Sequence, residues 1–245
     1  MAWEIMKSAL VRLVVIIAIG SVSTQCSRAE VRGSTVIVKQ ERSAQPISGL
    51  YADGSFDIEL TQGKEPALVV EADDNIVSLV KTEYQGQDLR IYLDQSNIKD
   101  LSFEHIRIYV TVPSIDAIHL NGPIELNGHG MWKMDQLNLF TQGPSDVHLD
   151  IQGELLATSI DGPSVIELHG HMGKQSIHIQ GPGKYHAGDL ESTEATVVIK
   201  GSGKVELNVR SALQVAITGP GIVSYSGSPQ VSSQINGPGR LIQRS

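Results

Sequence analysis

Apolar and polar residues alternate in short segments along the C-terminal half of the chain, which is the pattern of a strand with one buried face. A glycine interrupts the alternation every 18 to 21 residues, and the residue before each of these glycines is polar. The glycines of this repeat are Gly122, Gly143, Gly162, Gly181, Gly201, Gly219 and Gly237. Such a period predicts a repeat architecture, and the polar residues before the glycines are expected to face solvent.

Each repeat is predicted to form a strand, a corner and a second strand. Proline follows six of the seven glycines, and serine follows Gly201. Glycine allows positive φ angles and proline fixes its own φ without offering a donor, so the pair suits a bend. Two short strands per repeat are too few for a propeller blade but suit one coil of a parallel β-solenoid. A β-sandwich of hairpins is the alternative, although it does not explain the single period.

An eighth copy of the repeat lies upstream around Gly54, where Leu50 and Ile58 fill equivalent apolar positions. An insert, residues 61–113, separates this copy from the others. The insert is predicted to contain a strand at 67–72, a helical turn at 75–80, a hairpin at 85–88 and a strand at 105–112. Solenoid ends need protection from edge-to-edge pairing, so the insert is expected to cap the N-terminal end.

The predicted fold is therefore an all-β parallel solenoid of about eight coils, in a single domain covering residues 30–245. Its corners are expected at Gly54 and at the seven glycines of the repeat. The second residue before a corner is isoleucine in five consecutive repeats. These residues, expected to form one buried column, are Ile160, Ile179, Ile199, Ile217 and Ile235.

Three segments carry a resemblance to a known family. They are ISGLYADGSFDIELTQG, ALVVEADDNIVSLVKTEYQGQDLRIYLD and IRIYVTVPSIDAIHLNGP, and glycine-punctuated coils follow them. In this order they resemble the putative auto-transporter adhesin, head GIN domain family over about residues 33–245. The resemblance implies a right-handed parallel β-helix on an exported bacterial protein. It implies no activity, and it assigns no functional residue.

The N-terminus has the pattern of an export signal. Lys7 and Arg12 precede an apolar stretch, residues 13–19, which is too short for a membrane span of about 20 residues. Residues 1–29 are therefore predicted to be a signal peptide. Cys26, the only cysteine, is a candidate for lipidation; the alternative is cleavage after Ala29. The expected location is the periplasm, outer membrane or surface of a Gram-negative bacterium, with membrane attachment only through such a lipid.

Composition excludes some partners. The formal net charge is −8, which argues against nucleic acid as a ligand. Aromatic residues make up only 4% of the chain. A broad sugar-stacking face is therefore not expected, although a narrow sugar site stays open.

Stacked coils bring equivalent residues about 4.8 Å apart, so remote residues become neighbours. Histidine and glutamate alternate at the fifth position after the glycines. The row consists of Asn127, His148, Glu167, His186, Glu206 and Ser224. It could be a metal- or pH-sensing ladder, or a solvated row of paired charges that contributes little to stability.

Two further groups of residues are candidates for catalysis or metal binding. Glu125 and Asp146 are expected to lie about 5 Å apart, which is the carboxylate separation of retaining glycosidases, but any stacked acidic pair would share this spacing. His169 and His171 are two residues apart, and His129 has the same offset as His169. A metal needs three or four ligands, so these histidines fall short. We predict no catalytic, cofactor-binding or metal-binding residue.

The predicted function is a non-enzymatic binding or scaffolding module of the cell envelope, with an adhesin-like role. A polysaccharide-active enzyme, either a lyase or a glycosidase, is the alternative, by analogy with other β-helices only. The expected ligand is an envelope or extracellular protein or glycan. Self-association through the last strand, residues 240–245, is also expected unless Arg240 and Arg244 prevent it.

Overall fold

The computed structural model describes residues 29–244, which form strands, turns and loops without a helix. The strands are β1 (Ala29–Arg32), β2 (Ile37–Arg42), β3 (Gly49–Asp53), β4 (Phe56–Gln62), β5 (Ala67–Asp73), β6 (Val80–Gln85), β7 (Asp88–Leu93), β8 (Ile98–Ser102), β9 (Arg107–Val112), β10 (Ala117–Asn121), β11 (Ile124–Lys133), β12 (Gln136–Gln142), β13 (Asp146–Asp161), β14 (Val165–Gln180), β15 (Lys184–Lys200), β16 (Lys204–Thr218), β17 (Ile222–Ser226), β18 (Gln230–Asn236) and β19 (Arg240–Gln243). This part of the chain therefore contains no helix that could span a membrane.

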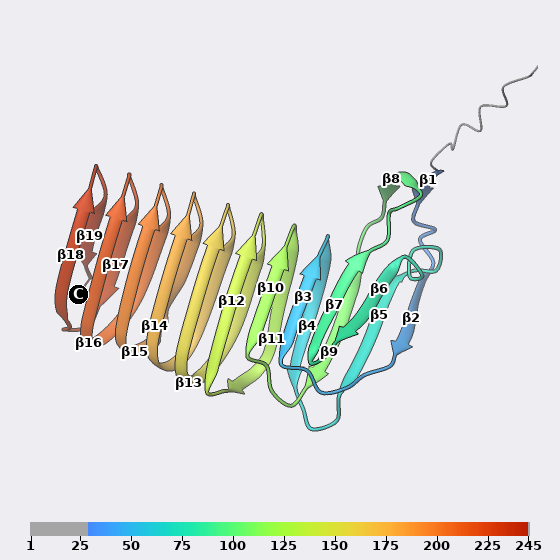
Figure 1. Ribbon diagram of the computed structural model, residues 1–245, viewed down its shortest axis with the longest axis horizontal. Helices are drawn as coiled ribbons and strands as arrows, with labels where there is room; N and C mark the ends of the chain where they lie inside the picture. Colours follow the sequence, from blue (N-terminus) through green and yellow to red (C-terminus); the bar gives the residue numbers. More distant parts are fainter. Residues whose placement is uncertain (1–28, 245) are drawn as a thin grey trace, which may run out of the picture.

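The strands build a flattened solenoid with two parallel sheets (Figure 1). The first sheet runs through β7, β3, β10 and β12, continues in the C-terminal halves of β13 to β16, and ends at β18. The second runs through β9, β4 and β11, continues in the N-terminal halves of β13 to β16, and ends with β17 and β19. Seven turns follow one another from β10 to β19, and the copy around Gly54 stacks beside them, so the predicted solenoid is confirmed.

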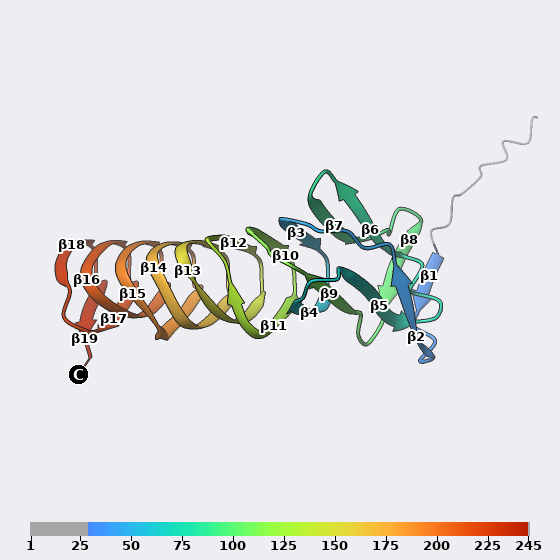
Figure 2. The same cartoon turned by 90° about the horizontal axis from the view of Figure 1, so that it is seen from below.

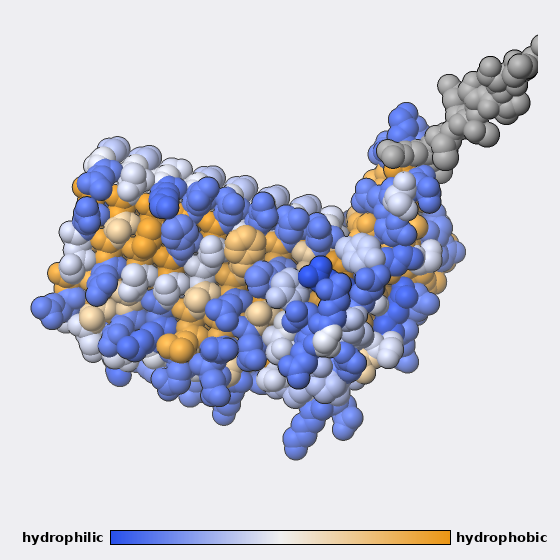
Figure 3. Space-filling model, viewed as in Figure 1, coloured by the Kyte–Doolittle hydropathy of each residue, from blue (hydrophilic) through white to orange (hydrophobic). Residues whose placement is uncertain are grey.

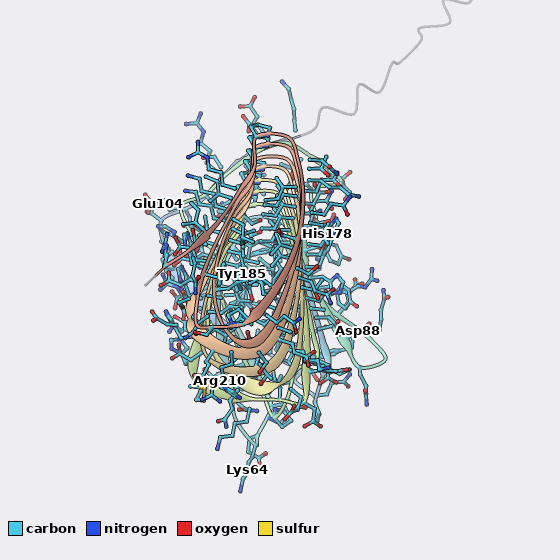
Figure 4. The ribbon with its side chains drawn as sticks, turned by 90° about the vertical axis from the view of Figure 1, so that its left-hand side faces the viewer. Lys64, Asp88, Glu104, His178, Tyr185 and Arg210 are labelled. Carbon is cyan, nitrogen blue, oxygen red and sulfur yellow. The ribbon has the colours of Figure 1, made fainter. Side chains whose placement is uncertain are left out.

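The core fills the narrow space between the sheets. In Figure 4, which looks along the stack, Tyr185 lies between the sheets while His178 and Arg210 lie outside them. The five isoleucines of the predicted column are paired in register from coil to coil. Four of them are at most 1% exposed, and Ile235 in the last coil is partly buried. The prediction of a stacked column is confirmed.

The corners are narrow because successive glycines approach each other closely. All eight corner glycines have φ angles between +93° and +142°, a range that side chains other than hydrogen disfavour. A Cβ atom on Gly122 would lie 2.5 Å from the carbonyl oxygen of Gly54 in the preceding coil. The polar residues before the seven repeat glycines are all exposed, as expected.

The insert caps the N-terminal end and also supplies a layer of the stack. The predicted strands and hairpin are present as β5, β6–β7 and β9, and residues 74–79 form a hydrogen-bonded turn. β7 pairs in parallel with β3, and β9 pairs in parallel with β4, so the two strands lie outside the first coil. Antiparallel β6 then covers β7, while β5 and β2 cover β9. These antiparallel strands replace the open edge that a parallel stack would expose there.

Candidate functional site

The predicted histidine–glutamate row exists on the outer face of the second sheet. Register pairing joins its members from Asn127 through to Ser224. The Nδ1 atom of His148 lies 3.4 Å from Glu167, and that of His186 lies 3.4 Å from Glu206. The side chains of these four residues are roughly a third to a half exposed, so their contacts contribute little to stability. The arrangement is that of a solvated row of histidine–carboxylate contacts.

Further histidines and carboxylates lie beside this row on the same face of the sheet. His169 lies 3.1 Å from Asp150 and 3.4 Å from Glu167, whereas His171 contacts Glu191 instead. The two histidines therefore face different carboxylates and do not converge. Across residues 29–244, no group of three or more histidine, cysteine or acidic side chains is placed to hold a metal ion.

Glu206 of this row also forms an ion pair with Arg244, whose guanidinium lies 2.7 Å from its carboxylate. Burial alone would raise the pKa of Glu206. Hydrogen bonds from His186 and Arg244 outweigh this effect, so the pKa of the carboxyl lies below its usual value. The Glu206 carboxylate is therefore ionised at pH 7, and the ion pair joins the residue that follows β19 to the row.

The expected equivalence of His129 and His169 is wrong. The repeat between Gly122 and Gly143 has 21 residues, and β11 absorbs the extra length in an irregularity between Asn127 and Met131. Met131 consequently stands opposite Asp150, the residue that pairs with His169. His129 is displaced toward the preceding coil, where its Nε2 atom lies 2.6 Å from Glu59.

Glu125 and Asp146 are register partners on adjacent strands, as the spacing predicts. Both are exposed, and the Asn127 amide donates a hydrogen bond to Glu125 at 3.1 Å. Asp57 continues the row on the other side. The pair thus stands on an open strand face with an acidic neighbour.

Cys26, the lipidation candidate, lies outside the described residues.

A row of aromatic rings that was not predicted from the sequence lies on the outer face of the first sheet. Tyr51, His119 and Phe140 are register partners on β3, β10 and β12. The Tyr51 and His119 rings stack with centroids 4.4 Å apart, and Phe140 follows at 5.6 Å with a tilt of 37°. Arg90 of β7 lies 5.6 Å from the centroid of Tyr51 and extends the row. The available signal was that all three rings stand three residues before a corner glycine.

A cavity of about 660 Å³ opens beside these rings. The β6–β7 hairpin rises next to β3 and β10 and bounds it on one side (Figure 2). Asp53 and Asn121 border it near the corners and are joined by a hydrogen bond of 3.1 Å from the Asn121 amide. On the hairpin, the Tyr92 hydroxyl donates to Glu83 at 2.7 Å. We call this the aromatic cavity.

The electrostatics of the aromatic cavity are mixed. Burial lowers the pKa of His119, and the nearby Asp88 carboxylate opposes this only in part, so its imidazole is neutral at pH 7. The carboxylates of Asp53 and Glu83 outnumber the guanidinium of Arg90. The site therefore combines apolar ring surface with hydrogen-bond donors and acceptors and a small excess of negative charge.

Comparisons with solved structures identify the same fold. A crystal structure described as a putative adhesin from Bacteroides fragilis superimposes with a TM-score of 0.83 at 22% identity, covering 87% of this chain and 100% of that one. One described as a putative lipid binding protein from Parabacteroides distasonis gives 0.73 at 22%, covering 89% and 100%. A putative adhesin from Parabacteroides merdae gives 0.71 at 18%, covering 88% and 99%. At these identities the likeness concerns the fold alone.

No match was found among curated proteins. The family model described as "Putative auto-transporter adhesin, head GIN domain" matches residues 47–229, well over half of the chain, and includes the insert and all coils but the last. That description implies export. The resemblance noted in the sequence is thereby confirmed, and the chain belongs to the putative auto-transporter adhesin, head GIN domain family.

Proposed function

We propose that the protein is a non-catalytic binding module of the bacterial cell envelope, with an adhesin-like role. The observation that carries the proposal is the shape of the stack. In-register coils hold outward rows at fixed spacing on two long faces, which suits recognition of an extended ligand. Figure 3 looks onto the first of these faces, where polar residues surround smaller apolar areas. Family membership supports the same role.

The geometry gives little support to a polysaccharide-cleaving enzyme. Catalysis by paired carboxylates requires one of them to be kept protonated by a sheltered environment. Glu125 and Asp146 are both exposed on a strand face, so neither carboxyl group is sheltered. The proposal therefore rests on binding.

Binding of the purified protein to isolated envelopes tests this proposal. We expect saturable retention on envelopes of the native host, with no release of reducing sugar from their polysaccharides over time. Retention is measured by co-sedimentation, and an unrelated β-helix protein of similar charge serves as the control. Steady release of sugar would favour the enzyme, and retention equal to the control would remove the binding role.

We further propose that the protein is held at the periplasmic or outer surface through a lipid on Cys26, after removal of the segment before it. The arrangement of basic, apolar and small residues ahead of Cys26 supports this. Mass spectrometry of the native N-terminus distinguishes an acylated cysteine at position 26 from an unmodified start at Glu30. The second result would indicate a released protein.

Self-association through the last layer is a further proposal. β18 pairs with β16, β19 pairs with β17, and six of the seven residues of β18 are exposed. Val231 and Ile242 are 37% and 42% exposed in this layer, and an exposed strand edge invites pairing with another chain. We propose that a second copy docks there.

The two arginines of the last layer provide the test. Replacing Arg240 and Arg244 together by leucine removes two guarding charges and is expected to raise the apparent mass in light scattering. Val231→Pro removes a backbone donor from β18 and is expected to lower it. A monomer for the wild type and both variants at high concentration would exclude docking at this edge.

A further inference from the structure

We propose that the aromatic cavity is a binding subsite for a neutral saccharide. The proposal rests on the proposed binding function and names the class of ligand. A pyranose ring has an apolar C–H face and a rim of hydroxyl groups, each of which can donate and accept. A matching site needs an aromatic surface beside closely spaced donors and acceptors.

The aromatic surface is concentrated at one place. Phe140 contacts His119 on one side, and its partner on the other side is Ser159, whose side chain is small. The next ring-bearing residue of the row is His178, two coils beyond Phe140. Phe140 is therefore the last ring of the row at this end, and the rings of Tyr51, His119 and Phe140 together line one wall of the cavity. The tilt of 37° turns Phe140 out of the stack formed by its neighbours.

The polar border supplies both kinds of hydrogen-bonding group. Asp53 provides acceptors, while Asn121 provides an acceptor and a second amide hydrogen beyond the one it gives to Asp53. Across the cavity, Gln85 and Gln95 add amides, and Glu83 adds a carboxylate already held by Tyr92. Because the paired side chains already hold one another by hydrogen bonds, they can bind adjacent hydroxyl groups of a sugar with little further loss of their own conformational entropy.

The charge and the polarity of the site select among ligand classes. Two carboxylates, Asp53 and Glu83, stand against a single guanidinium, so an anionic ligand is disfavoured. An acyl chain would cover Asp53 and Asn121 without offering them hydrogen bonds, which costs binding free energy. The volume of about 660 Å³ lies within the range of small-molecule sites. A neutral mono- or disaccharide meets all three constraints.

Calorimetric titration of the purified chain tests the proposal. The probes are lactose, cellobiose and N,N′-diacetylchitobiose. We expect at least one to bind saturably, and we expect Phe140→Ala and Asn121→Ala each to weaken that binding by about tenfold. His178→Ala is the matched control, because it lies in the same row outside the cavity, and it should bind like the wild type.

The outcomes separate this proposal from the binding function. Folding of each variant is checked by circular dichroism, and Asn121→Ala changes only an exposed position of the first sheet. Failure of all three disaccharides to bind, or equal binding by every variant, overturns the saccharide subsite. Saturable binding of palmitate that is lost in Phe140→Ala, without saccharide binding, overturns it in favour of a lipid. If the wild type is still retained on envelopes in these cases, the proposed function stands without the subsite; if retention is also absent, both fail.

Discussion

Replacing Ile199 by alanine is expected to lower the free energy of unfolding by about 2–5 kcal/mol, because it removes buried methyl groups and leaves a cavity. Ile199 is fully buried and stands at the middle of the isoleucine column, between Ile179 and Ile217. Neighbouring coils cannot close the gap, since ladder hydrogen bonds on both sides fix their spacing. Chemical denaturation followed by circular dichroism measures the loss.

The control lies on the same strand. Val198 is the adjacent residue and points to the outside of the first sheet, where it is only partly buried. Val198→Ala is expected to cost at most about 1 kcal/mol, mainly through strand propensity. Equal losses for the two variants would contradict the assignment of Ile199 to a closely packed column.

Gly170→Ala is expected to be as damaging as a core truncation, although the glycine is not one of the repeat corners. Its φ angle is +114°, and a Cβ atom there would lie 2.2 Å from the carbonyl oxygen of Ile151. The backbone conformation alone costs about 1–3 kcal/mol for a residue with a side chain. The close contact adds to this, because β13 can move away only by breaking its ladder with β14. Thermal unfolding provides the measurement.

Gly188 is a suitable control in the next coil. A Cβ atom on Gly188 would meet nothing within 4 Å, and its φ angle is not positive. Gly188→Ala is therefore expected to be neutral, or to stabilise the fold by about 0.4–1 kcal/mol through a less flexible unfolded chain. If Gly170→Ala is equally well tolerated, the close approach of the two coils does not exclude a side chain at position 170, and the prediction is wrong.

The sequence could not single out Gly170 by its period. It stands eight residues after a corner glycine, and the same offset holds Gly130 and Gly227 in two other repeats. The remaining four repeats have Ile151, Asp189, Val209 and Ser245 there. The need for glycine arises where one coil bends against the carbonyl of its neighbour. That approach differs between coils, so it is visible only when they are stacked.

The aromatic cavity, too, could be predicted from the sequence only in part. The shared offset of Tyr51, His119 and Phe140 could have predicted a stacked row, because register makes equal offsets adjacent. The cavity beside the row could not have been predicted, since its second wall is the β6–β7 hairpin. The position of that hairpin follows from the pairing of β7 with the outer edge of β3.

By itself, the sequence determined the repeat: its corners, its buried column and its outward rows of histidine and glutamate. Those features depend only on residues at equal offsets in a parallel, in-register stack, where spacing along the chain becomes adjacency in space. Only the tertiary structure decided where the insert went and how the irregular repeat was absorbed. β7 and β9 fold back outside β3 and β4, and His129 shifts toward Glu59. The partner of a free strand edge or of a bulged segment depends on which other segments lie near it in the folded chain, and the period of the sequence does not contain that information.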